Sequence, residues 1–342
     1  MNISTHRLVN GFLLSILFVA VQCPEMSGQG RKLSDLDHLT NNASIQQVVP
    51  ASNGCLWVFG ELSPVDDNFA INSCGSSFHI RNIGKIGYFQ QIQRVRNNIF
   101  WAIIDGTLVE IELSEGDLQL SRTLEATHTF LAGLFFIDTM RGWACGRDGK
   151  ILATLDGGRN WNLQTTKTDI HLRQIRFSDN KFGWAIGEEN RDGDFLSIFL
   201  TTENGGRTWQ QQVLPSGGSL TSASFVTGFT GCGLLDTKTV YCTRGGRRWK
   251  SVSIENQNLS DIIFVSRDVG YVVGDTISKT INGGKVWRSV LEDSQNRQFS
   301  SLDGVIFSSP KLGYVWDPHT VLATKNGGKT WENISRHWFE RR

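Results

Sequence analysis

Hydrophobic positions recur along the chain in short runs with a period of about forty residues. Five periods contain a glycine followed by a residue that is usually aromatic, as in Gly142-Trp143. A leucine lies twelve positions before that residue and a phenylalanine seven positions before it, as Leu131 and Phe136 do before Trp143. A large aliphatic residue usually stands nine positions before it. Positions seven and nine share a parity, so they face the same side of a strand. The pattern predicts four short antiparallel strands per period, for example 172–177, 183–186, 197–202 and 209–214.

An eight-residue element with a Gly-Gly pair follows the third predicted strand of each period. Its five copies begin at Thr154, Thr202, Cys242, Thr280 and Thr324, at spacings of 48, 40, 38 and 44 residues. Asp or Asn in its third position can fix a tight turn, Gly-Gly permits positive φ, and the closing Trp can pack back over the hairpin. We interpret these residues as structural: Thr154, Asp156, Gly158, Trp161, Thr202, Asn204, Gly206, Trp209, Gly246, Trp249, Thr280, Asn282, Gly284, Trp287, Thr324, Asn326, Gly328 and Trp331.

Two degenerate copies, at 71–78 and 112–119, bring the number of units to seven. Seven units of four antiparallel strands predict an all-β fold, a seven-bladed β-propeller. We expect residues 44–342 to form this single domain. Residues 31–43 are polar and are expected to be a linker or a closing strand.

The eight-residue elements resemble the Asp-box, or BNR, repeat, Ser/Thr-x-Asp-x-Gly-x-Thr-Trp. The copy at Thr154 departs from it only at the seventh position, and the copy at Thr324 has Asn326 in place of the aspartate. With Gly-Trp-x-x-Gly ahead of the box at 142–146 and 183–187, the chain resembles the photosystem II stability/assembly factor-like propellers of the sialidase-like superfamily. This resemblance implies a non-catalytic, chaperone-like protein of an exported compartment. The matching motifs are structural, so they do not carry the photosystem role itself.

The N-terminus has the features of a secretory signal. A short polar segment with Arg7 precedes the apolar run 11–21, which is shorter than the ~20 residues that span a bilayer. We expect residues 1–30 to be a signal peptide and the mature protein to be exported, secreted or periplasmic. A membrane anchor is expected only in the alternative that Cys23 is lipidated.

Composition narrows the function classes. Lys and Arg number 34 against 33 Asp and Glu, a net charge of +1, which argues against a nucleic-acid-binding surface over the whole protein. Thirty-six glycines and 11 tryptophans against 6 prolines are typical of many short strands and tight turns. There is no Cys-x-x-Cys, and the seven histidines lie far apart, so we expect no metal site and no cofactor.

Export permits disulfides, and the mature chain has an odd number of cysteines. Cys232 and Cys242 flank a short turn between predicted strands, so they are a candidate pair. The same register would place Cys55 opposite Ser73. A Cys55–Cys74 disulfide, the second candidate, would then need a bulge. Cys145 is expected to be a small buried residue.

The turns between the second and third strands of the blades carry many acidic residues, whereas the hairpins between the third and fourth strands carry Arg and Lys. In a propeller these B–C turns share one face, so we hypothesise an acidic face that docks a cationic partner. The alternative is that Asp-Gly is simply a good hairpin turn, as at Asp105 and Asp148. The candidate binding residues are Asp66, Asp67, Asp148, Glu188, Glu189, Asp192, Asp194, Asp236, Asp275 and Asp317.

Catalytic motifs are not evident, and no catalytic residue is assigned. Sialidases also carry Asp boxes, and a resemblance to them would imply a catalytic set with three arginines and a Tyr–Glu pair. The Phe/Tyr-Arg-Ile-Pro motif of sialidases is absent here, and only four tyrosines occur. A lectin would place exposed aromatic residues at the channel mouth, for which Trp316, Tyr88 and Phe89 are candidates. The sequence therefore favours a protein-binding scaffold or assembly factor. The alternative is a carbohydrate-binding or glycoside-hydrolysing propeller with a glycan partner.

Overall fold

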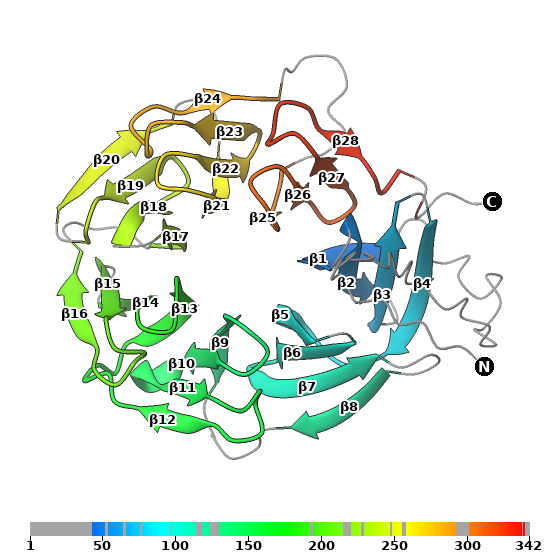
Figure 1. Ribbon diagram of the computed structural model, residues 1–342, viewed down its shortest axis with the longest axis horizontal. Coiled ribbons are helices and arrows are strands. Elements are labelled where there is room, and N and C mark those ends of the chain that lie inside the picture. The colour runs from blue at the N-terminus through cyan, green and yellow to red at the C-terminus, as the bar shows by residue number, and fades with distance from the viewer. Residues whose placement is uncertain are drawn as a thin grey trace, which may run out of the picture.

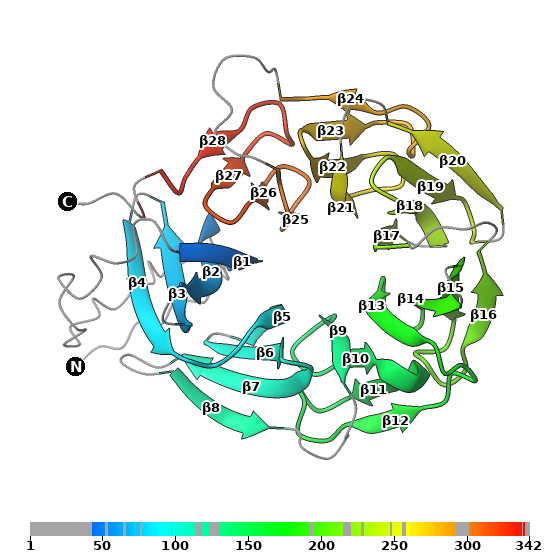
Figure 2. The same cartoon turned by 180° about the vertical axis from the view of Figure 1, so that it is seen from behind.

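The computed structural model describes residues 43–338, apart from 52–53, 64–65, 76, 97, 114–117, 124–129, 192–193, 215–219, 227–228, 247, 255–257, 292–300 and 337. Within these residues the strands form seven four-stranded antiparallel sheets. They stand as blades around a central opening, seen from its two ends in Figures 1 and 2. This confirms the predicted seven-bladed propeller. The predicted signal segment and residues 31–42 lie outside the described residues.

The first three blades follow one another in chain order, each numbered from its innermost strand to its outermost. Blade 1 comprises β1 (Ala43–Pro50), β2 (Leu56–Leu62), β3 (Asp67–Cys74) and β4 (Ser77–Gly84). Blade 2 comprises β5 (Phe89–Arg96), β6 (Ile99–Ile104), β7 (Thr107–Leu113) and β8 (Leu118–Thr123). Blade 3 comprises β9 (Leu131–Phe136), β10 (Gly142–Gly146), β11 (Ile151–Thr154) and β12 (Asn162–Gln164), with a 3-10 turn, η4 (Arg147–Gly149), between β10 and β11.

The remaining four blades repeat this order. Blade 4 comprises β13 (His171–Phe177), β14 (Gly183–Arg191), β15 (Asp194–Thr202) and β16 (Gln210–Val213). Blade 5 comprises β17 (Ser222–Val226), β18 (Thr230–Leu234), β19 (Thr239–Thr243) and β20 (Trp249–Ser253). Blade 6 comprises β21 (Leu259–Phe264), β22 (Gly270–Gly274), β23 (Ile277–Thr280) and β24 (Arg288–Ser289). Blade 7 comprises β25 (Gly304–Phe307), β26 (Gly313–Trp316), β27 (Val321–Thr324) and β28 (Glu332–Asn333). No helix among the described residues has the length and apolar character needed to cross a membrane.

The hydrophobic core lies between the blades. Buried apolar side chains of the described residues form seven clusters, each drawn from two adjacent blades. The predicted leucine and phenylalanine of the inner strand take part, as Leu172 and Phe177 do beside Trp143. Burial of apolar area is the main stabilising term in folding, so each blade depends on both of its neighbours.

The Asp-box hairpins have one hydrogen-bond pattern in blades 3, 4, 6 and 7. In blade 3 the Thr154 hydroxyl accepts the Gly158 N–H at 2.8 Å and donates to Asp156 Oδ1 at 2.9 Å. Asp156 Oδ1 in turn accepts the Asn160 N–H at 2.9 Å. Both box glycines have positive φ, 75° at Gly157 and 90° at Gly158. The corresponding hydroxyl-to-amide distances at Thr202, Thr280 and Thr324 are 2.9, 3.0 and 2.8 Å.

The tryptophan that closes each box packs edge-on against the inner-strand phenylalanine of its own blade. Phe136 and Trp161 have ring centroids 5.8 Å apart and planes at 88°. The other four pairs have centroid distances of 5.7–6.3 Å and planes at 83–86°. Edge-to-face geometry is favourable for aromatic rings. The two residues that define the repeat in sequence are therefore in contact in space.

Blade 5 departs from this box by one residue. Thr243 pairs with Gly231, as Thr154 pairs with Gly142. Thr243 therefore takes the position of the box threonine, and the prediction that Cys242 begins this box was wrong. From Thr243 to Gly246 the hairpin is one residue shorter, and no Asp or Asn stands between them. The Thr243 hydroxyl instead donates to the Arg248 carbonyl at 2.7 Å.

Blade 7 meets blade 1 to close the ring, and each is built from its own four strands. The Ile45 N–H donates to the Pro318 carbonyl at 2.7 Å, and His319 Nδ1 lies 2.9 Å from the Ala43 carbonyl. The apolar cluster at this boundary contains Tyr314 and Trp316 from blade 7 together with side chains of β1, β2 and β3. Loop contacts and packing therefore join the two ends of the repeat array.

Candidate functional site: the central channel and its mouth

A cavity of about 840 Å³ occupies the centre of the ring, a size typical of ligand-binding sites. Strands β1 and β5 supply most of its wall, and Phe135, Arg176, Asp261 and Trp316 reach it from other blades. Alternate residues of an inner strand point into the channel because successive side chains leave a strand on opposite faces. Five glutamines contribute to the wall and make it largely polar: Gln46, Gln47, Gln90, Gln91 and Gln93.

Many polar side chains of the inner strands bind the backbone of the next blade. Gln91 Oε1 accepts the Leu134 N–H at 2.7 Å, and Gln174 Oε1 accepts the Ala223 N–H at 2.9 Å. Such contacts satisfy edge-strand groups that have no further strand to pair with. Similar side-chain bonds occur at 3.2 Å from Gln46 to the Phe89 N–H, 2.8 Å from Ser224 to the Phe264 N–H and 3.0 Å from Asp261 to the Val305 N–H.

Arg176 and Asp261 place opposite charges in the channel wall. Burial lowers the pKa of the Arg176 guanidinium and raises the pKa of the Asp261 carboxyl, and each partly offsets the other's shift. Asp261 accepts the Ser222 hydroxyl at 2.6 Å and the Ile262 N–H at 2.9 Å, which also lowers its pKa. Hydrogen bonds to the charged form stabilise it, so the channel holds a carboxylate fixed by its own blade and the two beside it.

Acidic groups also line the cavity. Gln46 donates to Glu61 at 3.1 Å. Burial, followed by the charge of Asp317, raises the pKa of the Asp303 carboxyl above its ordinary value. Two carboxylates and a glutamine can bind hydroxyls, amines or amides. Among the described residues no group of three or more His, Cys, Asp or Glu side chains forms a potential metal site.

Aromatic residues stand at the mouth of the channel on the face where the inner strands begin. Tyr88, directly before β5, is 56% exposed, and Phe130, directly before β9, is 37% exposed. His171 takes the same position in blade 4, and its ring lies 6.4 Å edge-on from Phe130. Arg147 lies over the Phe130 ring, with Cζ 5.0 Å from the ring centroid. We call Tyr88, Phe130 and His171 the aromatic arc.

Tyr88 was predicted from the sequence as a candidate, whereas Phe130 and His171 were not. The missed signal is positional, because Phe130 and His171 each precede the repeat leucine, Leu131 and Leu172. The other aromatic candidates lie differently. Phe89 is fully buried, and Trp316 is 8% exposed while lining the cavity.

Several of the predicted acidic residues on the B–C turns bind backbone N–H groups of their own blade. Asp236 accepts the Lys238 and Thr239 N–H groups, both at 2.6 Å. Buried Asp317 accepts the Thr320 N–H at 2.7 Å, and Asp275 accepts the Asn258 N–H at 2.7 Å. The local contacts of Asp236 and Asp317 are Asx contacts that stabilise tight turns, whereas Asp275 binds the backbone just before the first strand of its own blade.

Three other acidic residues of the B–C turns have side-chain partners. Asp66 pairs with Lys85 at 2.9 Å, Asp67 accepts an amide proton from Asn82 at 2.9 Å, and Asp148 lies 3.8 Å from Lys150. Asp66, Asp105 and Asp148 have φ of 55°, 49° and 58°, which Asp tolerates better than most residues. These carboxylates therefore have partners within the chain, and binding of another molecule by them stays a prediction.

Glu188 is the exception, because it is buried in the core of blade 4. It pairs with Arg173, and it stands opposite His171 in the strand register. Its second oxygen, Oε2, and His171 Nε2 have no hydrogen-bond partner among the described residues. Burial, then the charges of Arg173 and Arg147, lowers the pKa of His171. The remaining candidates, Glu189, Asp192 and Asp194, have side chains outside the described part of the chain.

The structure contains both candidate disulfides. Cys232 and Cys242 are joined across β18 and β19, where they are register partners. Cys55 and Cys74 are joined with a Cα separation of 4.3 Å. Leu56, not Cys55, pairs with Ser73, so the expected one-residue slip was wrong and no bulge is needed. Cys145 is a buried free thiol, and burial raises its pKa to about 12.

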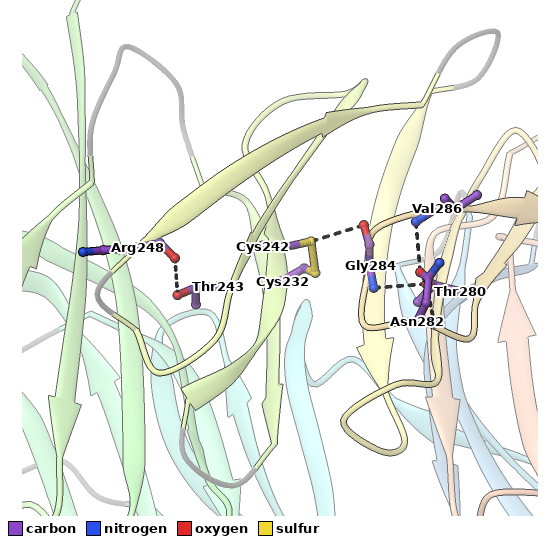
Figure 3. The surroundings of a disulfide bond; sticks show 8 residues. All are labelled: Cys232, Cys242, Thr243, Arg248, Thr280, Asn282, Gly284 and Val286. Carbon is purple, nitrogen blue, oxygen red and sulfur yellow. Dashed lines mark hydrogen bonds between the residues drawn. A yellow bond between two sulfur atoms is a disulfide. The ribbon is translucent and has the colours of Figure 1, made fainter.

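The Cys232–Cys242 disulfide lies at a blade boundary (Figure 3). Cys232 holds the position that Trp143 holds in blade 3, and the Gly-Gly hairpin of blade 6 packs against it. Cys242 Sγ lies 3.8 Å from the Gly284 carbonyl. A Cβ on Gly284 would come within 2.6 Å of both sulfur atoms, so this position needs glycine. In blade 2 the equivalent contact is the Trp101 indole, whose Nε1 donates to the Gly157 carbonyl at 3.2 Å.

The fold and the box geometry define the class of this protein, a seven-bladed Asp-box β-propeller. Residues 243–337 match the profile of the family described as Photosynthesis system II assembly factor YCF48. Over those residues the match confirms the resemblance that the repeats indicated. No curated protein matches the chain.

Solved structures with the same fold support this class. "YCF48 bound to D1 peptide" aligns with a TM-score of 0.65 and 13% identity over 83% of this chain and 94% of that one. "YCF48 from Cyanidioschyzon merolae" aligns with a TM-score of 0.61 and 12% identity over 84% and 97%. "Streptogramin B lyase structure" aligns with a TM-score of 0.57 and 11% identity over 80% and 90%. At these identities the likeness establishes the fold.

Proposed function

We propose that this chain is an exported, non-catalytic propeller that binds a protein partner as an assembly or stability factor. The observation that carries the proposal is the exposed aromatic arc at the mouth of a polar channel. Aromatic residues near the centre of an interface often dominate its binding energy. The profile match and the likeness to a YCF48 that binds a D1 peptide support a protein as the partner.

The channel mouth is favoured over the opposite face for a physical reason. Its aromatic arc combines exposed Tyr88 and Phe130 with the charged neighbours Arg147 and Asp148. A protein contact requires this mixture of apolar centre and polar rim. On the opposite face the polar residues of the Asp boxes bond within their own hairpins, and exposed apolar residues such as Leu155 and Ile281 lie in separate hairpins, of blades 3 and 6.

A non-catalytic role fits the chemistry of the channel. Asp261 is held by three hydrogen bonds from protein groups, an arrangement that stabilises the wall rather than offering a base to a substrate. The alternative, a glycan-directed propeller, draws on Trp316, Asp303 and Glu61 in the cavity. Buried Trp316 offers little open ring surface for stacking on a sugar, so the protein partner is the better-supported reading.

The test is affinity capture from the exported fraction of the host with the full mature chain as bait. The wild type is compared with Tyr88→Ala/Phe130→Ala and with the matched control Leu155→Ala/Ile281→Ala, whose side chains are both 71% exposed in box hairpins of the other face. We expect the first variant to lose the partner and the control to keep it. Repeating capture at high salt reports the contribution of the acidic turns, since exposed charges are screened.

Two outcomes of the capture experiment would overturn parts of the proposal. Equal capture by both variants would move the interface away from the channel mouth. Retention on immobilised glycans without a protein partner would favour the alternative function. Export is tested separately by N-terminal sequencing of the native protein, which should show cleavage at or before Arg31, and a Cys23→Ser variant tests the lipid anchor.

A further inference from the structure

Arg176 presents a fixed guanidinium in the channel wall. Its Nη1 donates to the carbonyls of Leu134 at 3.1 Å and Ile175 at 2.8 Å. Its Cζ lies 5.5 Å from the centroid of the Phe135 ring, in a cation–π contact. Two carbonyls and an aromatic face hold the group in one orientation, so little side-chain entropy remains to be lost on binding a ligand.

The rest of the guanidinium is available. Nε and Nη2 have no acceptor among the described residues, and Arg176 makes no ion pair within 4.0 Å there. Asp261, the carboxylate that acts on the pKa of Arg176, directs its oxygens to Ser222, Ile262 and Val305. The positive charge therefore has a long-range counter-charge but no direct partner. Such an edge matches the two oxygens of a carboxylate.

The chemistry of the cavity selects the kind of anion. Glu61, Asp261 and Asp303 line it together with Arg94 and Arg176. These side chains carry three negative and two positive charges, a net charge of −1 before a ligand binds. A singly charged carboxylate is therefore repelled less in the cavity than a doubly charged phosphate. The amide nitrogens of Gln90 and Gln91 have no acceptor among the described residues and can donate to peptide carbonyls.

We propose that Arg176 anchors a carboxylate of an extended peptide segment that enters through the channel mouth. Arg176 lies five residues beyond His171 on β13, about 16 Å along a strand at ~3.3 Å per residue. A peptide of about five residues spans that depth. The carboxylate belongs to its C-terminus or to an Asp or Glu side chain. This inference rests on the proposed function, and it names the group of the partner that the channel recognises.

Three synthetic pentapeptides of alanine and serine, all N-acetylated, test the proposal by isothermal titration calorimetry. The first has a free C-terminal carboxylate, the second is its carboxamide, and the third is a carboxamide with one Asp. We expect a carboxylate peptide to bind at least about tenfold more tightly than the neutral one, because charge-assisted hydrogen bonds are stronger than neutral ones. The first and third peptides distinguish a chain terminus from a side chain as the source.

Variants assign the effect to the residue. Arg176→Gln should reduce the carboxylate peptides to the affinity of the neutral one. Arg176→Lys, a point charge without the fork, should keep a smaller preference. Arg159→Gln removes the same charge from an exposed box hairpin and should change nothing. If Arg176→Gln fails to fold, Arg176→Lys carries the test, because full retention of the preference in it excludes the bidentate contact.

Several results would overturn the inference. One is equal affinity for the carboxylate and neutral peptides. Another is an equal loss in Arg159→Gln. Acetate that binds as tightly as the peptides would make the site one for small carboxylates. Partner capture by Arg176→Gln at the wild-type level would reject this inference while leaving the proposed function in place; absence of any partner for the wild type would reject the proposed function instead.

Discussion

Blades 3 and 5 use different residues to hold the hairpin between their third and fourth strands and to pack against the next blade. In blade 3 an eight-residue box, closed by the Thr154 hydroxyl and the Asp156 carboxylate, tightens the hairpin, and Trp143 fills the boundary with blade 4. In blade 5 the box is one residue shorter, and the Thr243 hydroxyl donates to the Arg248 carbonyl. Cys232 takes the position that Trp143 has in blade 3. A disulfide to Cys242 then joins the two central strands.

The two blades distinguish two structural roles, one of the box and one of the residue that follows the glycine of the second strand. The box fixes the hairpin between the third and fourth strands, and the aromatic residue after the glycine packs against the next blade. Trp143 does so by stacking on Phe177 with ring centroids 3.6 Å apart. Blade 5 replaces that large side chain with two small ones held together covalently. Variants in the two blades can therefore measure each role by itself.

The largest expected effect is at the boundary between blades 3 and 4. Trp143→Ala removes an indole that is 2% exposed and leaves a cavity against Phe177. We expect a loss of about 3–5 kcal/mol in the free energy of unfolding. Urea denaturation measures it. Leu163→Ala, at a side chain that is 66% exposed on the outer strand of the same blade, should cost less than about 0.5 kcal/mol. Similar losses in the two variants would contradict the boundary role of Trp143.

The next effect tests the covalent solution in blade 5. Cys232→Ser with Cys242→Ser should lower the free energy of unfolding by about 2–4 kcal/mol, because the unfolded chain regains the freedom of the closed loop. The paired comparison is Cys55→Ser with Cys74→Ser, whose loop is longer, 19 against 10 residues of separation. Non-reducing peptide mapping establishes both bonds beforehand. Unchanged unfolding in the blade 5 variant would mean that the disulfide is not what replaces the tryptophan.

A smaller difference separates the two box threonines. Thr154→Val leaves the buried Gly158 N–H without its acceptor and also removes the bond to Asp156, so we expect a loss of about 1–3 kcal/mol. Thr243→Val removes one donation to the Arg248 carbonyl and should cost about 0.5–1.5 kcal/mol. The unfolding midpoints of the two variants against the wild type give the comparison. An equal or reversed order would show that the shortened hairpin depends on its threonine as much as the full box does.

The regular parts of the fold could be predicted because each is encoded locally and repeated. The parity of the inner-strand residues, the Gly-Gly pair and the closing Trp all lie within one period, so the blades and their number followed from the sequence. The one-residue deletion in blade 5 did not. Gly-Gly and Trp aligned Cys242 with the box threonines, whereas the strand pairing of Gly231 assigns that place to Thr243.

The candidate site was less predictable because it forms between blades. Arg176 occupies an ordinary inner-strand position, and its meaning depends on Leu134 and Phe135, about forty residues earlier. For the acidic turns, in contrast, the sequence predicted a binding surface, but most of the described residues bind groups of their own chain. Their composition indicated a charged face, yet in a turn such as the one at Asp236 the carboxylate binds backbone N–H groups of the turn.

The smallest expected effect concerns the one regular box that has an acid in its third position. Hydrogen bonds from the backbone and side chain of Asn160, and then from Thr154, lower the pKa of Asp156 to about 2, from an ordinary value near 3.9. A lowered folded-state pKa stabilises the fold above the unfolded pKa, and this contribution is lost as pH falls through the folded value. We therefore expect Asp156 to add a small loss of stability between about pH 4 and pH 2.

Asp156→Asn tests this by converting the blade 3 box to the asparagine form that Asn204, Asn282 and Asn326 already have in blades 4, 6 and 7. The variant should unfold like the wild type at or below pH 2 and show a shallower decline on acidification between pH 4 and pH 2. Thermal unfolding across that range measures the difference. The control is Asp179→Asn, in the turn between β13 and β14 of blade 4. An identical pH slope in the wild type and Asp156→Asn would mean that the charge of the box aspartate adds nothing to what its oxygen already does as an acceptor, and that Asp and Asn boxes are interchangeable in this ring.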